Sequence, residues 1–181
     1  ISIRLPETVR SVGREAFADA ADLRAIDLAN VSEVGKDAFR GTAFENKYVE
    51  LWKSGEFSGV IYTGKVAYKY MSSDSSSKLM SKGTKLVLEN STTGVSESLF
   101  DNSYIDMDSC RSNLRSVYIP ADTSFIPSGI FRGFKGSGSG VGIYGIRESY
   151  ASDYAAEQDI SFTALNKKDS YAQGNMDHYW Y

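Results

Sequence analysis

A six-residue phrase that occurs four times constrains the fold of this chain more than any other feature. Residues 12–17 read VGREAF, residues 34–39 read VGKDAF, and looser copies stand at 95–100 and 126–131. An apolar-x-apolar pair precedes each copy: Ile3/Leu5, Ile26/Leu28, Leu86/Leu88 and Val117/Ile119. Because one short unit cannot bury its own apolar face, such repetition predicts a supersecondary unit stacked on copies of itself.

Each copy has the same physical pattern. The alternation in residues 2–5 turns Ile3 and Leu5 to one face, and Pro6 ends the strand because it cannot donate to a ladder. Phe17 then fills the space between neighbouring units. Alignment of the copies predicts a core of Ile3, Leu5, Phe17, Ile26, Leu28, Phe39, Leu86, Leu88, Phe100, Val117, Ile119 and Phe131.

Residues 3–17, followed by 22–28, resemble the BspA-type leucine-rich repeat of bacterial surface proteins, whose unit reads approximately I-x-I-P-x-x-V-x-x-I-G-x-x-A-F-x-x-C-x-x-L. Cys110 with 113–120 looks like the C-x-x-x-L variant of that unit. The resemblance implies a β-rich α/β fold in which short stacked strands form a leucine-rich-repeat solenoid. That solenoid should be irregular, since the third and fourth copies lack the glycine of the first two.

The pattern also predicts how the chain is divided. A single leucine-rich-repeat domain should cover residues 1–165, with an insertion at about 45–83 and a polar tail at 166–181. Within the insertion, alternation on both sides of Thr63-Gly64 predicts a β-hairpin at 58–71. One short C-terminal helix is expected within 148–159, where Tyr and Ala recur at helical spacing.

Composition excludes several classes of protein. The 181 residues are 41% hydrophobic and carry a formal net charge of -3, with Lys and Arg scattered rather than clustered, so a nucleic-acid partner is not expected. No run of 18 apolar residues occurs, and no membrane insertion is expected. The chain opens on Ile1 without a methionine or a leader, which suggests a processed or excised form. We expect a monomer.

Catalytic chemistry finds little support. The single histidine, His178, lies in the aperiodic tail, and with Cys110 it makes too few ligands for a zinc site. Asp101, Asp106 and Asp108 lack the spacing of an EF-hand. The G-x-G-x-x-G at 140–145 leads into a strand rather than a helix, unlike a dinucleotide site. We therefore expect no enzyme, no cofactor and no metal.

Binding is the remaining class of function. Outward positions of the paired strands are Ser2, Arg4, Ala25, Asp27, Lys85, Val87, Ser116 and Tyr118, and a second candidate surface comprises Trp52, Tyr62, Tyr68 and Tyr70. From these surfaces the candidate binding residues are Arg4, Asp27, Val87, Tyr118, Tyr62 and Tyr68. Because a filled core leaves no cavity, the ligand should lie on a shallow surface rather than in a deep pocket.

Two functions follow from this interpretation. The family resemblance implies a non-catalytic interaction module, extracellular or on the cell surface, that binds a host or bacterial surface protein or a polysaccharide in the manner of an adhesin. The alternative is a structural spacer that presents a neighbouring domain and binds nothing itself.

Overall fold

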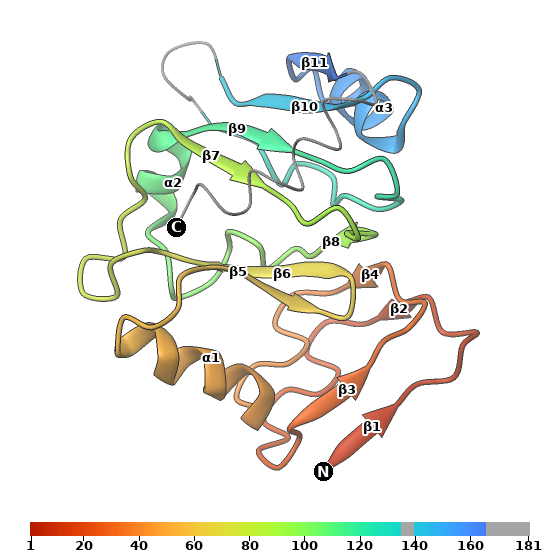
Figure 1. The fold of residues 1–181 in the computed structure, drawn as a ribbon, viewed down its shortest axis with the longest axis vertical. Coiled ribbons are helices and arrows are strands. Elements are labelled where there is room, and N and C mark those ends of the chain that lie inside the picture. Colours follow the sequence, from red (N-terminus) through yellow and green to blue (C-terminus); the bar gives the residue numbers. More distant parts are fainter. Residues whose placement is uncertain (135–139, 166–181) are drawn as a thin grey trace.

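Several small sheets and three helices follow one another along the long axis of the molecule, from the N-terminus at one end to α3 and β11 at the other (Figure 1). The computed structural model describes residues 1–134 and 140–165, and these counts refer to that part of the chain. The architecture is mixed α/β. The polar tail predicted at 166–181, His178 included, lies outside the described residues.

The first two copies of the repeat lie side by side in register. Strand β1 (Ser2–Arg4) pairs in parallel with β3 (Ala25–Asp27), and β2 (Ser11–Val12) pairs in parallel with β4 (Glu33–Val34). Ile3 stands beside Ile26 and Val12 beside Val34, as the alignment of the copies requires. The same positions of the two copies therefore meet in space.

Two helices were missed from the sequence, which predicted only the short C-terminal helix. Helix α1 (Ala43–Lys53) begins after the cap residue Thr42, and the short helix α2 (Met107–Asn113) begins after Asp106. The buried positions of α1 have helical spacing, but the first of them is Glu45. A charged residue at a buried position hides the amphipathic pattern by which a helix is recognised in a sequence.

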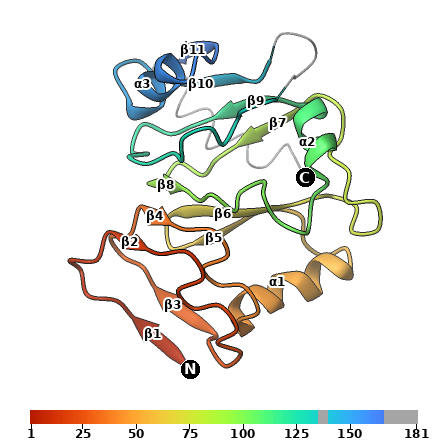
Figure 2. The same cartoon turned by 180° about the vertical axis from the view of Figure 1, so that it is seen from behind.

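The predicted hairpin is present. Strands β5 (Gly59–Thr63) and β6 (Val66–Met71) pair in antiparallel fashion across a turn at Gly64, whose φ is +60°. β6 also pairs in parallel with β8 (Gly94–Val95), which belongs to the third copy. The hairpin lies between the N-terminal strands and the C-terminal sheet, and it is covered on both faces (Figure 2).

A β-bulge interrupts the alternation of β6. Ile61 pairs with Lys69 and Tyr62 pairs with Ala67, so Tyr68 is the extra residue on the bulged strand. Consecutive residues of a regular strand point to opposite faces, and a bulge breaks that rule. As a result, both Tyr68 and Lys69 face the N-terminal half of the molecule.

Four parallel strands make the C-terminal sheet, in the order β11-β10-β9-β7. They are β7 (Thr84–Val87), β9 (Leu114–Tyr118), β10 (Gly142–Ile146) and β11 (Phe162–Leu165). Helix α3 (Tyr150–Glu157) connects β10 to β11, as predicted for residues 148–159.

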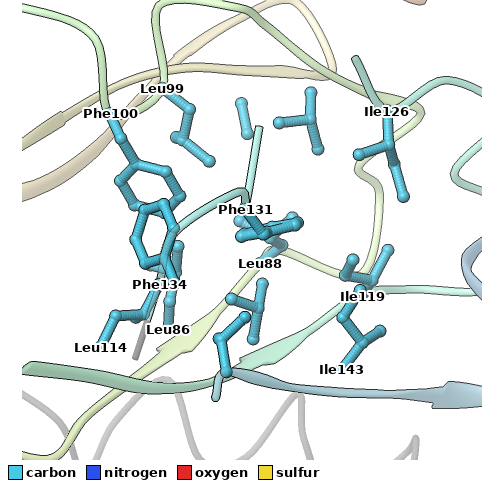
Figure 3. Close-up of a cluster of buried hydrophobic side chains, with 14 of the residues drawn as sticks. Leu86, Leu88, Leu99, Phe100, Leu114, Ile119, Ile126, Phe131, Phe134 and Ile143 are labelled. Atoms are coloured by element: carbon cyan, nitrogen blue, oxygen red, sulfur yellow. The ribbon is translucent and has the colours of Figure 1, made fainter. Parts of the chain in front are cut away.

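The core consists of two apolar clusters, one on each side of the hairpin. Figure 3 shows the larger one, where phenylalanines of the third and fourth copies pack above the C-terminal sheet. Of the twelve predicted core residues, eight are buried: Leu28, Phe39, Leu86, Leu88, Phe100, Val117, Ile119 and Phe131. The other four, Ile3, Leu5, Phe17 and Ile26, are only half-buried, and they belong to the first two copies.

Candidate functional site

Arg4 and Asp27 lie opposite each other on β1 and β3 and satisfy each other's charge. Their side chains form an ion pair with an Nε–Oδ2 distance of 3.1 Å, and both are exposed. The predicted strand face therefore exists at this end of the molecule. Exposed pairs of this kind contribute at most about 1 kcal/mol to stability, so the pair is available to other partners at little cost.

The outer face of the C-terminal sheet carries a row of side chains across four strands. Val87, Tyr118, Tyr144 and Thr163 are successive register partners, and we call them the tyrosine row. The rings of Tyr118 and Tyr144 are stacked, with centroids 4.6 Å apart and planes inclined by 20°. Both rings are half-buried, and partial burial together with Tyr144 raises the pKa of Tyr118.

Ser116 does not belong to the exposed face, although its outward position predicted that it would. The residue is only 3% exposed. It lies on β9, a central strand, between its register partners Lys85 and Gly142.

The second predicted surface, made of aromatic residues of the insertion, is largely wrong. Tyr68, a predicted binding residue, is 0% exposed, and Trp52 is 5% exposed, with its indole N–H donating to the Ser72 carbonyl oxygen. Tyr62 is half-buried, and its hydroxyl oxygen accepts from the Glu89 backbone N–H at 2.9 Å. These rings are buried because the hairpin is an internal layer, which strand alternation alone does not reveal.

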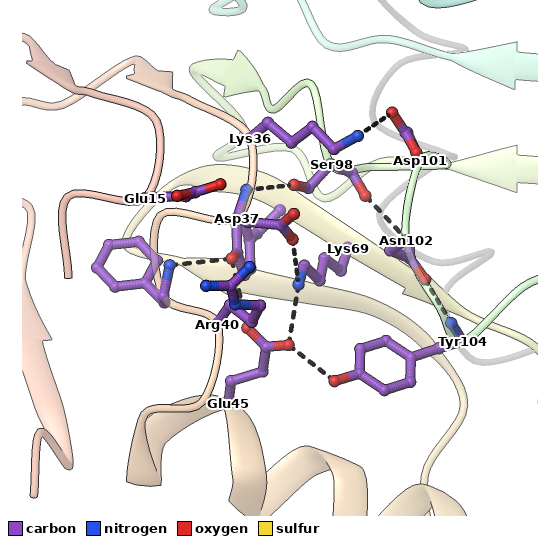
Figure 4. Close-up of polar contacts among 12 residues, drawn as sticks. Glu15, Lys36, Asp37, Arg40, Glu45, Lys69, Ser98, Asp101, Asn102 and Tyr104 are labelled. Carbon is purple, nitrogen blue, oxygen red and sulfur yellow. Dashed lines mark hydrogen bonds and ion pairs between the residues drawn. The ribbon is translucent and has the colours of Figure 1, made fainter. Parts of the chain in front are cut away.

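A cluster of buried charges lies where the hairpin meets the second copy and α1 (Figure 4). Lys69 Nζ is 2.9 Å from Glu45 Oε1 and 3.0 Å from Asp37 Oδ1. The three side chains are 3%, 0% and 19% exposed, respectively. We call Lys69, Asp37 and Glu45 the buried triad.

Two tyrosines complete the surroundings of the triad. The hydroxyl of Tyr104 donates to Glu45 Oε1 at 2.9 Å, and that of Tyr68 donates to Glu45 Oε2 at 3.3 Å. Lys69 Nζ lies 5.1 Å and 5.6 Å from the centres of the Tyr68 and Tyr104 rings. Burial, and secondarily the charge of Glu45, raises the pKa of both tyrosines well above the ordinary value.

The backbone places each member of the triad. Asp37 has a φ of +54° and its N–H donates to the Ser98 hydroxyl at 2.8 Å, so it is held in a left-handed turn against the third copy. Glu45 is at the start of α1, and the bulge directs Lys69. The sequence analysis missed all three residues, because a Lys in an alternating hairpin is usually exposed, and the burial depends on a bulge.

An open groove of about 1180 Å³ lies beside α2, at the edge of the larger apolar cluster. Its apolar lining includes Phe100, Ile130 and Phe134, and its charged lining includes Arg111 and Arg132. The sequence predicted a shallow binding surface without a hollow, so this groove was not expected. The expectation considered the filled core, whereas the groove forms between α2, which the repeat pattern did not predict, and the loop of the fourth copy.

The acidic residues considered as candidate metal ligands have structural roles instead. Asp106 caps α2 by accepting from the Ser109 N–H, and Asp101 pairs with Lys36 at 2.6 Å. Within residues 1–134 and 140–165, no three His, Cys, Asp or Glu side chains are grouped as metal ligands.

Burial raises the pKa of the Cys110 thiol to about 12. The same part of the chain has no helix with the length and apolar character to cross a membrane.

Comparison of the chain with protein-family models, with curated proteins and with solved structures finds no match.

Proposed function

We propose that this chain is a non-catalytic interaction module that binds a protein or glycan partner through the tyrosine row. One observation carries the proposal: Tyr118 and Tyr144 are stacked and only half-buried on the outer face of the four-stranded sheet. Tyrosine rings are enriched at interfaces because they offer apolar area and a polar hydroxyl with few rotatable bonds. Val87 and Thr163 extend this area on both sides.

We further propose that the repeats form an irregular leucine-rich-repeat solenoid of the BspA type. The parallel in-register pairing of successive copies supports this assignment. So does a series of ring contacts from one layer to the next, with centroid distances of 5.6 Å for Phe17–Phe39, 5.5 Å for Phe39–Tyr68, 5.9 Å for Phe100–Phe131 and 6.3 Å for Phe131–Tyr154.

The resemblance to bacterial surface repeats also supports an extracellular or cell-surface location. An adhesion-type module there would meet a host or bacterial surface protein, or a polysaccharide. The tyrosine row suits such a partner, since it is uncharged and extends across four strands instead of enclosing a small ligand.

A binding screen against extracellular-matrix proteins and glycans tests the proposal. The double variant Tyr118→Ala/Tyr144→Ala should lose at least tenfold in affinity for any partner that the unchanged protein binds. Tyr150→Ala, which changes a 40% exposed tyrosine on α3 outside the row, is the matched control and should bind normally. Equal affinity of the double variant would refute the proposed surface. The absence of any partner in the screen would favour the structural spacer.

A further inference from the structure

We propose that the side chains of Lys69 and Asp37 become joined by an amide bond that the folded chain itself forms, with Glu45 as the catalytic carboxylate. The buried triad brings together an amine, a carboxyl group and a second carboxylate within hydrogen-bond distance. Such a bond is a covalent modification within one chain. It is independent of the binding function proposed above.

The amine and the carboxyl group are already close to a reactive geometry. Lys69 Nζ is 3.0 Å from Asp37 Oδ1, and the carboxyl carbon Cγ is one bond beyond that oxygen. The bulge in β6 fixes the position of Lys69, and the left-handed turn fixes that of Asp37. Holding two reactants in this way removes the entropic cost of bringing them together.

The bond forms by condensation and needs no co-reactant from outside the chain. Nζ attacks Cγ of Asp37, the Nζ–Cγ bond forms, and one Cγ–O bond breaks. The nitrogen loses two of the three protons of the ammonium group, and both leave with the departing carboxyl oxygen as one water molecule. One positive and one negative charge disappear, so atoms and charge balance without oxidation or reduction.

Glu45 is placed to move the proton between the two partners. Its Oε1 is 2.9 Å from Lys69 Nζ, so it can accept a proton from the nitrogen and deliver it to the departing oxygen. The hydroxyls of Tyr68 and Tyr104 donate to the two oxygens of Glu45 and hold it in position.

Burial favours the product over the ion pair. Glu45 and Lys69 are almost completely inaccessible to solvent and Asp37 is 19% exposed, so few water molecules can reach the amide to reverse the reaction. A buried ion pair carries a large desolvation cost, whereas a neutral amide in its place carries a smaller one.

The proposed bond would tie the second copy of the repeat to the hairpin. Asp37 precedes α1 and Lys69 is on β6, so the bond would close a loop that contains α1 and β5. Pulling on the two ends of the chain could then not extend the segment between residues 37 and 69. This property would suit either a module or a spacer under mechanical load.

Mass spectrometry of the unchanged protein under denaturing conditions tests the bond directly. We expect an intact mass lower than that of the sequence by one water molecule, and, after protease digestion, a branched peptide that contains both Lys69 and Asp37. An intact mass equal to that of the sequence, together with a linear peptide containing free Lys69, would overturn the proposal. This measurement requires no variant to fold.

The catalytic role of Glu45 is tested separately with Glu45→Gln, which keeps both bonding partners. Circular dichroism should first show that this variant is folded. We then expect its intact mass to equal the mass calculated from its sequence, because no amide bond has formed and no water has been lost. Glu50→Gln makes the same change on an exposed face of α1, and its mass should be one water molecule below that calculated from its own sequence. If Glu45→Gln does not fold, Glu45→Asp keeps a carboxylate at a greater distance and should form the bond more slowly. If either folded Glu45 variant forms the amide bond completely and at an unchanged rate, Glu45 is not the catalytic carboxylate.

Discussion

The backbone N–H of Phe39 donates to the hydroxyl oxygen of Tyr68 at 3.0 Å, and the Tyr68 ring lies edge-on to the Phe39 ring at 5.5 Å. The same hydroxyl donates to Glu45 at the start of α1. One side chain therefore joins the hairpin, the second copy of the repeat and the first helix. This contact explains why Tyr68, which appears from its sequence to be a surface residue, is part of the core.

Phe39→Ala should lower the free energy of unfolding by about 3–5 kcal/mol, because it removes a fully buried ring and leaves a cavity. Urea denaturation followed by circular dichroism measures the change. Phe17→Ala is the control: Phe17 stacks on Phe39 at 5.6 Å but is only half-buried, so its removal should cost less. Equal losses for the two variants would contradict the layered core.

Gly94→Ala should destabilise the protein by about 1–3 kcal/mol, near the upper end of that range. A Cβ at Gly94 would overlap the backbone carbonyl oxygen of Ser32, and a backbone atom cannot move aside as a flexible side chain can. Thermal denaturation provides the measurement.

Gly13→Ala is the matched control for Gly94→Ala. Among the residues that the structure describes, nothing lies within 4 Å of a Cβ added there, and the φ of Gly13 is not in the left-handed region. We expect it to be neutral or to stabilise the fold by up to about 1 kcal/mol, through the entropy of the unfolded chain. A large loss at Gly13 with none at Gly94 would mean that the second and third copies do not meet as described.

Tyr68→Phe should cost about 1–3 kcal/mol, because it keeps the ring but leaves the buried N–H of Phe39 without its acceptor. Tyr150→Phe removes a hydroxyl from an exposed ring and should have almost no effect. Chemical denaturation of both variants gives the comparison. A Tyr68→Phe variant as stable as the unchanged protein would show that water or another group satisfies this N–H.

Stability should fall at alkaline pH, and Cys110 should contribute to the loss. Burial raises the pKa of its thiol from an ordinary value of 9.0 to about 12, so the folded state retains a proton that the unfolded state releases. The contribution of the Cys110 thiol to the free energy of unfolding is fully present below pH 9. It is lost between pH 9 and about 12, by about 1.4 kcal/mol per pH unit.

The measurement is the free energy of unfolding between pH 8 and pH 11, compared with Cys110→Ala. The variant will start from a lower stability because it leaves a small cavity, but its decline with pH should be less steep. In the unchanged protein, a thiol reagent should modify Cys110 only after denaturation. Rapid modification of the native protein would contradict the burial of the thiol.

The repeat pattern predicted the elements whose side chains alternate or recur at a fixed spacing. The pairs Ile3/Leu5 and Leu86/Leu88 do lie on, or directly after, short parallel strands, and Thr63-Gly64 does mark the hairpin turn. Helix α1 was missed because its buried stripe starts with Glu45, which a hydrophobic pattern counts as an exposed position. Local periodicity thus predicts an element only where burial and apolar character coincide.

The candidate sites depended much more on tertiary structure. Arg4 and Asp27 were predicted as outward residues of two copies, but only the structure shows that they form an ion pair. Tyr144 was missed as the stacking partner of Tyr118. The buried triad was not visible at all, since Asp37 and Glu45 resemble ordinary surface acids.

The amino-acid sequence by itself determined the repeated unit, the order of its copies and most of the residues that fill the core, because period and apolar character are local properties. Tertiary structure alone decided that the hairpin is covered on both faces and that a bulge turns Lys69 toward Glu45 and Asp37. The physical reason is that burial of a polar side chain depends on which partners arrive from distant segments. The spacing of residues along the chain does not predict the contact of Lys69 with Glu45 and Asp37.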